Sequence, residues 1–288
     1  MNYDAEAAAC RAQVEAALDR AVPEDIPEPL RGAMRYALLT PGKRLRPMLL
    51  IKSHEMLAPA GEDVLSFATA MEMIHAYSLV HDDLPAMDND VLRRGQPTCH
   101  VAYGEAMAIL AGDGLLNLAH ETMLNSVHPR AFPAARAISR YAGSYGMVGG
   151  QALDITFTGK SPDRAVIERM QTGKTAALFQ AAVTAGLILA GADEKLVAAG
   201  AEYGLGLGRA FQIIDDLLDL TSDAAMLGKT PGKDTAAGKL TWPSAVGETQ
   251  AREDARLWTE RAVDALASFG NSADFLRDTA RQALNRIR

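Results

Sequence analysis

The sequence lacks the features that mark secreted, membrane-spanning and nucleic-acid-binding proteins. Among 288 residues it has only two cysteines, Cys10 and Cys99, which are too few for a disulfide framework or a cysteine metal site. No uncharged apolar run reaches the roughly 18 residues of a membrane span, and the acidic start, residues 1–6, does not have a signal-peptide layout. With 36 acidic against 29 basic residues, the formal charge of −7 argues against nucleic acid as a partner. We therefore expect a cytoplasmic protein without a membrane span.

Runs of β-branched residues are also scarce, whereas Ala, Leu, Met, Glu and Arg recur throughout. This composition favours α-helices, and proline and glycine place their ends. Short loops and the absence of a dividing linker predict one all-α domain over 1–288, a single large bundle of long, mostly antiparallel helices around a central cavity. The expected helices cover 4–21, 30–39, 43–56, 62–81, 100–126, 133–158, 163–190, 194–221, 248–268 and 272–287, with polar loops at 88–97 and 222–239.

Two aspartate clusters follow apolar helical stretches. In the second, Asp215 and Asp219 are four residues apart, so both carboxylates lie on one helical face, where like charges repel. In the first, four carboxylates fall within 82–90, next to a helix C-terminus, which prefers cations. Each cluster alone could be a solvated acidic surface. A divalent cation would relieve both conflicts, and hard carboxylate oxygens favour Mg²⁺.

Basic residues lie where an anionic substrate would need them. Lys43, Arg44 and Arg46 follow a Pro-Gly break, and Arg93-Arg94 follows the first acidic cluster. Any one of them alone could be an ordinary surface charge, and their significance comes from their occurrence together with both aspartate clusters. Further candidates are Lys174, Lys229 and Lys239.

Taken together, these motifs resemble the trans-polyprenyl diphosphate synthase family, and bacterial farnesyl diphosphate synthases in particular. The resemblance covers nearly the whole chain. Pro41 departs from it by replacing a usual glycine, and Asn89 and Val91 stand where acidic residues are common. The supporting matches are 42–47, 92–98, 150–154, 173–175 and 228–229.

The resemblance implies Mg²⁺-dependent, head-to-tail condensation of isopentenyl diphosphate with dimethylallyl or geranyl diphosphate, giving farnesyl diphosphate (C15). Geranylgeranyl (C20) and geranyl (C10) diphosphate are the alternative products. It also implies about three Mg²⁺ ions per site and a homodimer, for which apolar helix faces such as 106–118 are available.

The family's functional residues transfer to matching positions of this chain. The implied metal ligands are Asp82, Asp83, Asp88, Asp215 and Asp219. The implied isopentenyl diphosphate site is Gly42, Lys43, Arg46, His75, Arg94, Phe211 and Gln212. The implied allylic diphosphate site is Arg93, Lys174, Thr175, Gln212, Lys229 and Lys239. The residues expected to carry catalysis are Asp82, Asp88, Arg93, Lys174, Thr175 and Asp215.

Tyr77 and Ser78 precede the first cluster by five and four residues, so they lie about one helical turn below it. A growing hydrocarbon tail would meet the Tyr77 ring there, and in the family an aromatic residue at this position resembles the C15 producers. The alternative is that Tyr77 is ordinary core packing.

Three other functions fit the sequence less well. A terpene cyclase would lack the basic isopentenyl site, and a non-catalytic regulatory subunit tends to lose one aspartate cluster. A nucleotide-binding protein is suggested by Gly-Lys-Thr at 173–175 and 228–230, but Glu168 and Asp223 replace the glycine that a phosphate-binding loop requires.

Overall fold

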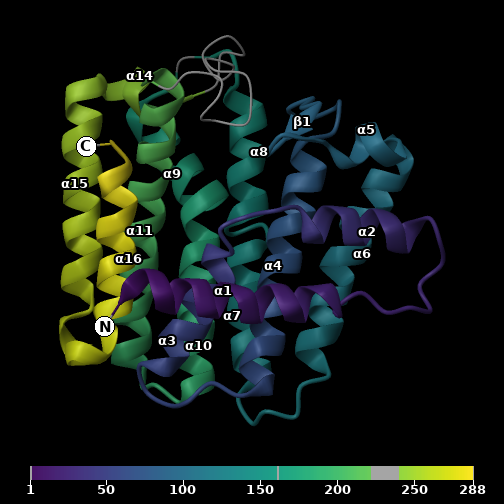
Figure 1. The fold of residues 1–288 in the computed structure, drawn as a ribbon. Helices are drawn as coiled ribbons and strands as arrows, with labels where there is room; N and C mark the ends of the chain where they lie inside the picture. The colour runs from purple at the N-terminus through teal and green to yellow at the C-terminus, as the bar shows by residue number, and fades with distance from the viewer. Residues whose placement is uncertain (1, 161, 222–239, 288) are drawn as a thin grey trace.

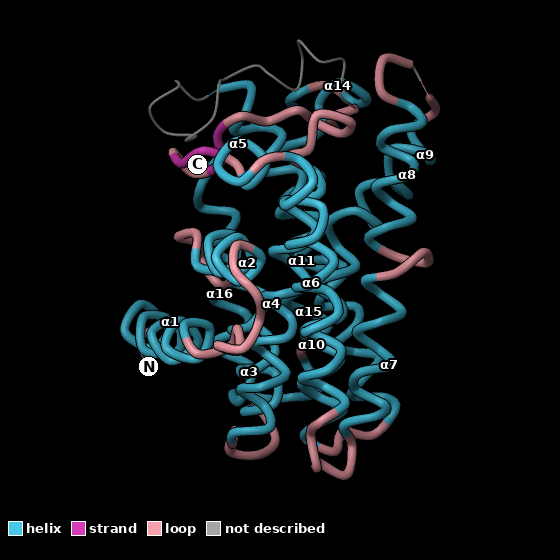
Figure 2. Tube along the Cα trace, turned by 90° about the vertical axis from the view of Figure 1, so that its right-hand side faces the viewer, coloured by secondary structure: helices cyan, strands magenta, loops and turns pink. Residues whose placement is uncertain are grey.

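The structure, a computed structural model, describes residues 2–160, 162–221 and 240–287, and helices make up most of it. Most of the long helices run with their axes nearly parallel, while α1 (Tyr3–Asp19) and α2 (Leu30–Leu39) lie across one face of the bundle (Figures 1 and 2). The other helices are α3 (Leu45–Glu55), α4 (Glu62–Asp82), α5 (Cys99–Tyr103), α6 (Glu105–Leu124), α7 (Ala131–Ala142), α8 (Met147–Phe157), α9 (Arg164–Gln171), α10 (Ala177–Ala190), α11 (Glu194–Thr221), α14 (Trp242–Val246), α15 (Glu248–Ala265) and α16 (Asp274–Leu284). The all-α prediction is confirmed.

Helix α10 forms the centre of the bundle. It has no charged residue and is buried on nearly every side, where it packs against α3, α7 and α11. A helix that is apolar all round belongs in a core. The continuous stretch Arg164–Ala190 is long and apolar enough to cross a membrane, but 72% of its most apolar window is buried inside the protein, as a core helix requires.

Several helix boundaries differ from the sequence-based expectation. The helix predicted over 133–158 is wrong, because non-helical backbone at Gly143 and Gly146 separates α7 from α8. A Cβ at Gly146 would lie 1.9 Å from the Tyr141 carbonyl oxygen, so only glycine fits this turn. The helix predicted over 100–126 is likewise divided by Gly104, whose φ of +85° lies in the left-handed region.

The connecting segments also contain structure that the sequence did not reveal. Within the loop expected at 88–97, β1 (Leu92–Arg93) pairs antiparallel with β2 (Gln96–Pro97). Between α9 and α10, residues Thr172–Ala176 form a π-helical turn, and such turns recur at functional sites. Two 3₁₀ segments, Ala267–Ala273 and Asn285–Ile287, flank α16.

The functional motifs collect at one end of the bundle. Helix α4 ends there at Asp82, and β1, α5 and α14 lie at the same end (Figure 1). Helix α11 carries the second aspartate cluster in its last two turns. The two clusters, more than 120 residues apart in the sequence, therefore come together by topology.

Candidate active site

Three cavities, of about 510, 560 and 620 Å³, share lining residues and so adjoin one another. We name them the acidic, basic and apolar cavities. Asp82, Asp88, Asp90, Asp154, Lys174, Gln212, Asp216 and Asp219 line the acidic cavity. Gly42, Lys43, Arg46, His75, Arg94, Phe211, Asp215 and Arg286 line the basic cavity. Tyr77, Ser78, Leu79, Met87, Met147, Val148 and Leu178 line the apolar cavity.

The shared residues mark where the cavities meet. Arg93 and Asp219 line both the acidic and the basic cavity. Lys174 and Thr175 line both the acidic and the apolar cavity. A ligand could therefore lie with a charged group in the acidic cavity and a hydrocarbon tail in the apolar one, close to a second anion in the basic cavity.

Asp82 and Lys174 form the floor of the acidic cavity. Asp82 accepts a hydrogen bond from the Gln151 amide, and Lys174 Nζ lies 3.7 Å from Asp82 Oδ1. Lys174 also donates to the buried Asp154 carboxylate at 2.5 Å. The cation is thus held between two carboxylates at the mouth of the apolar cavity.

The π-helical turn and two glycines determine the position of Lys174. A Cβ at Gly150 of α8 would lie 2.0 Å from the Lys174 backbone nitrogen. A Cβ at Gly173 would come within 2.9 Å of Gly150 Cα. Only a glycine pair lets the two backbones approach this closely.

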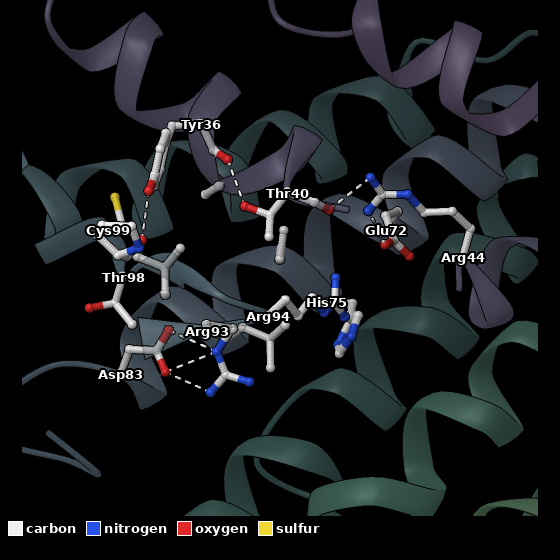
Figure 3. A pocket seen from close by; sticks show the side chains of 15 residues that line it. Tyr36, Thr40, Arg44, Glu72, His75, Asp83, Arg93, Arg94, Thr98 and Cys99 are labelled. Carbon is white, nitrogen blue, oxygen red and sulfur yellow. Dashed lines mark hydrogen bonds and ion pairs between the residues drawn. The ribbon is translucent and has the colours of Figure 1, made fainter. Parts of the chain in front are cut away.

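Asp83 is not part of the acidic cavity. Its buried carboxylate accepts three hydrogen bonds from the Arg93 guanidinium, at 2.6 to 2.9 Å. Figure 3 shows this pair pointing toward each other beside Thr98 and Cys99. Burial opposes the charge on Arg93, but the Asp83 carboxylate more than offsets this and raises the pKa of Arg93. The structure therefore gives Asp83 the role of holding Arg93 in place.

The three carboxylates of the second cluster lie in different surroundings. Asp215 faces the basic cavity and pairs with Arg286 at 2.8 Å, and Asp219 is buried where the acidic and basic cavities meet. Asp216 also lines the acidic cavity, where its buried carboxylate accepts from three hydrogen-bond donors. Burial raises the pKa of Asp216 to about 7, and those donors hold it below what burial alone would give.

The basic cavity is built around the turn that precedes α3. Arg94 Nη1 donates to the Pro41 carbonyl at 2.9 Å, and a Cβ at Gly42 would lie 2.4 Å from the same nitrogen. Pro41 thus supplies an acceptor for an expected substrate-binding arginine. Arg44 and Arg94 both have positive φ, 49° and 54°. Strained backbone of this kind clusters at binding sites.

Arg46 and His75 lie deeper in the basic cavity. Arg46 Nη1 donates to His75 Nε2 at 3.3 Å, and its guanidinium stacks over the Phe179 ring. Burial, reinforced by Arg46, Arg94 and other arginines, holds the pKa of His75 well below its ordinary value. His75 is therefore a neutral acceptor beside the arginines of the basic cavity.

A buried ion pair supports this wall. Arg44 donates to Glu72 at 2.8 Å and to the Thr40 carbonyl at 2.9 Å. Figure 3 shows Arg44 and Glu72 facing each other beside His75. The pair anchors the turn that carries Lys43 and Arg46.

Tyr77 and Ser78 both line the apolar cavity. The Tyr77 ring is buried and packs edge-on against His81, with ring centroids 5.8 Å apart. Ser78 donates its hydroxyl to the His75 carbonyl at 2.8 Å, so it is less available to a ligand. Of the two positions, Tyr77 presents the larger side chain to a tail.

Comparison with known proteins identifies this constellation. The model of the polyprenyl synthetase family matches residues 27–267. The chain belongs to the polyprenyl synthetase family. Geranylgeranyl pyrophosphate synthase 3, chloroplastic, from Arabidopsis thaliana is 43% identical over 267 residues, covering 90% of this chain and 74% of that protein. Most other relatives at 40–43% identity also carry geranylgeranyl pyrophosphate synthase names.

Solved structures agree with this membership. An FPP/GFPP synthase from Zymomonas mobilis superposes with a TM-score of 0.87 at 36% identity, covering 98% of this chain and 99% of that one. A geranyltransferase from Helicobacter pylori, complexed with magnesium and isoprenyl diphosphate, has a TM-score of 0.85 at 29% identity, covering 99% and 97%. The chain is a prenyltransferase, as the sequence predicted.

The donor set of this polyprenyl synthetase suits Mg²⁺. Within residues 2–160, 162–221 and 240–287, no three His, Cys, Asp or Glu side chains gather closely enough to hold an ion by themselves. Mg²⁺ needs no such cage, because it takes one or two carboxylates and completes its shell with water and substrate phosphates. Asp82, Asp88 and Asp219, all facing the acidic cavity, provide carboxylates of that kind.

The structure thus brings together most of the predicted site residues, with Asp83 as the exception. Lys229 and Lys239 lie outside the described residues. Sequence reasoning gave no role to Gln151, Asp154 or Arg286. The first two lie in the quoted 150–154 match, whereas no pattern pointed to Arg286.

Proposed function

We propose that this chain is a Mg²⁺-dependent prenyl diphosphate synthase that condenses isopentenyl diphosphate head to tail with an allylic diphosphate. The meeting of the three cavities carries the proposal. The acidic cavity suits a diphosphate bound through metal ions, and the basic cavity suits a diphosphate bound directly by cations. The apolar cavity leads away from the acidic one, as an allylic tail requires.

The reaction follows from this arrangement. The allylic C1–O bond breaks, and diphosphate leaves with the electron pair. The double bond of isopentenyl diphosphate supplies the electrons for the new C–C bond, which leaves a tertiary cation. Loss of a proton from the neighbouring carbon forms the new double bond, and an oxygen of the departed diphosphate accepts that proton.

Bound Mg²⁺ would supply Lewis-acid stabilisation of the leaving diphosphate. We assign its protein ligands to Asp82, Asp88, Asp215 and Asp219 and omit Asp83, whose carboxylate is engaged by Arg93. Lys174 and Arg93 are already at the acidic cavity and can bind the allylic diphosphate directly. Lys43, Arg46 and Arg94, with neutral His75, would hold isopentenyl diphosphate in the basic cavity.

The names of the relatives favour a C20 product, since most of them are geranylgeranyl pyrophosphate synthases. A second candidate, C15, is favoured by one observation of this chain. The buried Tyr77 ring lines the apolar cavity about one turn below Asp82, where it would stop a growing tail.

We also propose a homodimer. Helices α5 and α6 expose apolar side chains, including Val101 and Leu110, each half exposed, with Ile109. Exposed apolar side chains that gather into a patch mark interaction sites, and paired copies are the commonest assembly of soluble oligomers. Size-exclusion chromatography with light scattering should give twice the 30.7 kDa chain mass, and a monomer at micromolar concentration would contradict the assignment.

The decisive experiment is incubation with isopentenyl diphosphate and dimethylallyl or geranyl diphosphate, with Mg²⁺ or with EDTA, followed by chain-length analysis. Product should form only with Mg²⁺. A C20 product would support the chain length that the relatives' names favour, and a C15 product would support the limit set by the Tyr77 ring. No condensation in the presence of Mg²⁺ would overturn the proposed function.

A further inference from the structure

Asp216 is the centre of a buried hydrogen-bond chain that ends at the cavities. Its Oδ2 accepts from Gln171 Nε2 at 2.8 Å and from the Trp242 backbone N–H at 2.7 Å. Its Oδ1 accepts from Gln212 Nε2 at 2.7 Å, and Gln212 Oε1 in turn accepts from the Thr175 hydroxyl. One carboxylate thus links α9, α11, the π-helical turn and the start of α14.

Arg209, at the end of the hydrogen-bond chain away from the cavities, determines the direction of the hydrogen bonds that lead to Asp216. Arg209 can only donate, and its Nη1 lies 3.2 Å from Gln171 Oε1. Gln171 must therefore turn its NH₂ group toward Asp216. The Trp242 backbone N–H can also only donate, so Asp216 Oδ2 receives two hydrogens. Asp216 is held as an acceptor.

The same logic orients Thr175. Because Asp216 accepts, Gln212 must present its NH₂ group to the carboxylate and its carbonyl to Thr175. The Thr175 hydrogen then points at Gln212, and the oxygen lone pairs are left facing away from it. Thr175 lines both the acidic and the apolar cavity, so lone pairs directed away from Gln212 would be available to a ligand where the two cavities meet.

We infer that Asp216 is a positioning residue that sets the direction of the Thr175 hydroxyl dipole, so that its negative end faces the allylic carbon as positive charge develops there. The inference rests on the proposed function, which places the allylic C1 atom between the acidic and apolar cavities. Preoriented dipoles aimed at developing charge are among the largest contributions to catalysis. Asp216 thereby differs from Asp215 and Asp219, although all three belong to one motif.

The chemistry of Asp216 explains why an aspartate stands at this buried position. A carboxylate has two oxygens and can accept all three hydrogen bonds, whereas asparagine has one oxygen and one NH₂ group. Burial of a carboxylate is costly unless donors surround it, and here three do. In Asp216→Asn, the oxygen can still serve Gln171 and Trp242, but the new NH₂ group faces Gln212.

That substitution should reverse the dipole. The Gln212 amide would turn its carbonyl toward Asn at 216 and its NH₂ group toward Thr175. The Thr175 oxygen would then accept from Gln212, and its hydrogen would face the allylic carbon. We expect D216N to lower kcat by about 10²-fold. KM for both diphosphates should stay within about threefold, because the ground-state contacts are kept.

A double-mutant cycle separates this role from simple structural support. Thr175→Val removes the hydroxyl, so D216N has no dipole left to reverse and should change kcat by less than about threefold in that background. Thr175→Ser keeps the hydroxyl, and D216N should remain about 10²-fold deleterious there. An equal loss from D216N in the Val and Ser backgrounds would overturn the inference.

Two further measurements keep the test independent of folding and of metal binding. Mn²⁺ affinity, measured by EPR on the whole protein with inorganic diphosphate, should be unchanged in D216N and reduced in D215N. Equal reduction in both would make Asp216 a metal ligand and refute its positioning role. Asp254→Asn is the matched control, since Asp254 is also buried and bonds to the Trp242 indole but does not reach a cavity. It should keep wild-type kcat.

If D216N does not fold, Gln212→Met tests the same chain from its middle. It removes the acceptor of the Thr175 hydrogen, so kcat should fall more in the Thr175 background than in T175V, where only the cavity-lining role of Gln212 is lost. A loss of the same size in both would refute the inference. Absence of product from the wild-type enzyme would instead refute the proposed function, so the two failures are distinguishable.

Discussion

Replacing Tyr77 with alanine should lengthen the product by at least one isoprene unit. The ring is buried, packs edge-on against His81 and lines the apolar cavity below Asp82. Burial also raises the pKa of its hydroxyl, so the side chain is neutral when it meets a tail. The prediction holds whichever product the wild-type enzyme makes, because it concerns the change and not the starting length.

The size of the effect follows from the space that the ring fills. Removal of a buried aromatic side chain costs about 3–5 kcal/mol when the cavity stays empty. One further isoprene unit brings five carbons, each worth about 0.8 kcal/mol on burial, or about 4 kcal/mol in all. The longer tail can therefore recover most of the lost packing, which favours it over the wild-type product by about 10²-fold or more.

Chain-length analysis of incubations with isopentenyl diphosphate and one allylic diphosphate measures this directly. Tyr77→Phe keeps the ring and is the matched control, which should leave the product unchanged. Ser78→Ala removes only a hydroxyl that donates to the His75 carbonyl, so it should have a small effect. A thermal melt should show Y77A less stable when empty and partly restored by a longer prenyl diphosphate. If Y77A and wild type give the same product distribution, Tyr77 does not limit the tail.

Three further predictions test other parts of the site. Gly150→Ala would place a Cβ 2.0 Å from the Lys174 backbone nitrogen, so kcat should fall by more than about 10²-fold. The control is Gly61→Ala, whose Cβ meets nothing within 4 Å and which should leave kcat unchanged. Equal effects of the two substitutions would contradict the packing argument. Because burial and nearby arginines depress the pKa of His75, the unfolded chain binds a proton near pH 6.5 that the folded protein refuses. The contribution of His75 to stability is thus lost as pH falls below about 6.5. Thermal melts at about pH 7.5 and 5.5 should therefore show a larger loss of stability for the wild type than for His75→Gln. Equal losses in the two proteins would contradict this prediction. Finally, calorimetry in EDTA should show isopentenyl diphosphate binding to the basic cavity while geranyl diphosphate binding is lost; metal dependence of both would refute the division between the two cavities.

The sequence predicts the helices and the aspartate clusters well because both rest on local patterns. Helix-forming composition gives α4 and α11, and the i, i+4 spacing gives the shared face of Asp215 and Asp219. The sequence-based prediction fails where a single glycine determines the backbone conformation. Gly104 and Gly146 divide expected helices: Gly104 has a positive φ, and Gly146 passes close to the Tyr141 carbonyl oxygen. Helical propensity predicts neither feature.

Residue roles within a motif were harder to predict than the motif itself. Asp82 and Asp83 are neighbours in the sequence, yet one faces the acidic cavity and the other pairs with Arg93. Adjacent helical positions point about 100° apart, so an Asp-Asp pair cannot place both carboxylates in one site. The same geometry separates Asp215 from Asp216.

The pairing of charges explains how a protein with a formal charge of −7 can bind two multiply charged anions. Lys174 is held by Asp154, Arg93 by Asp83 and Arg286 by Asp215. A partly buried cation without a counter-charge is costly, so these carboxylates stabilise the cations before substrate arrives. On the proposed function, Lys174 and Arg93 would gain diphosphate oxygens when substrate binds, and bound Mg²⁺ would take up carboxylates such as Asp215. Binding would then exchange one charged partner for another, so that the cations are never left without a counter-charge.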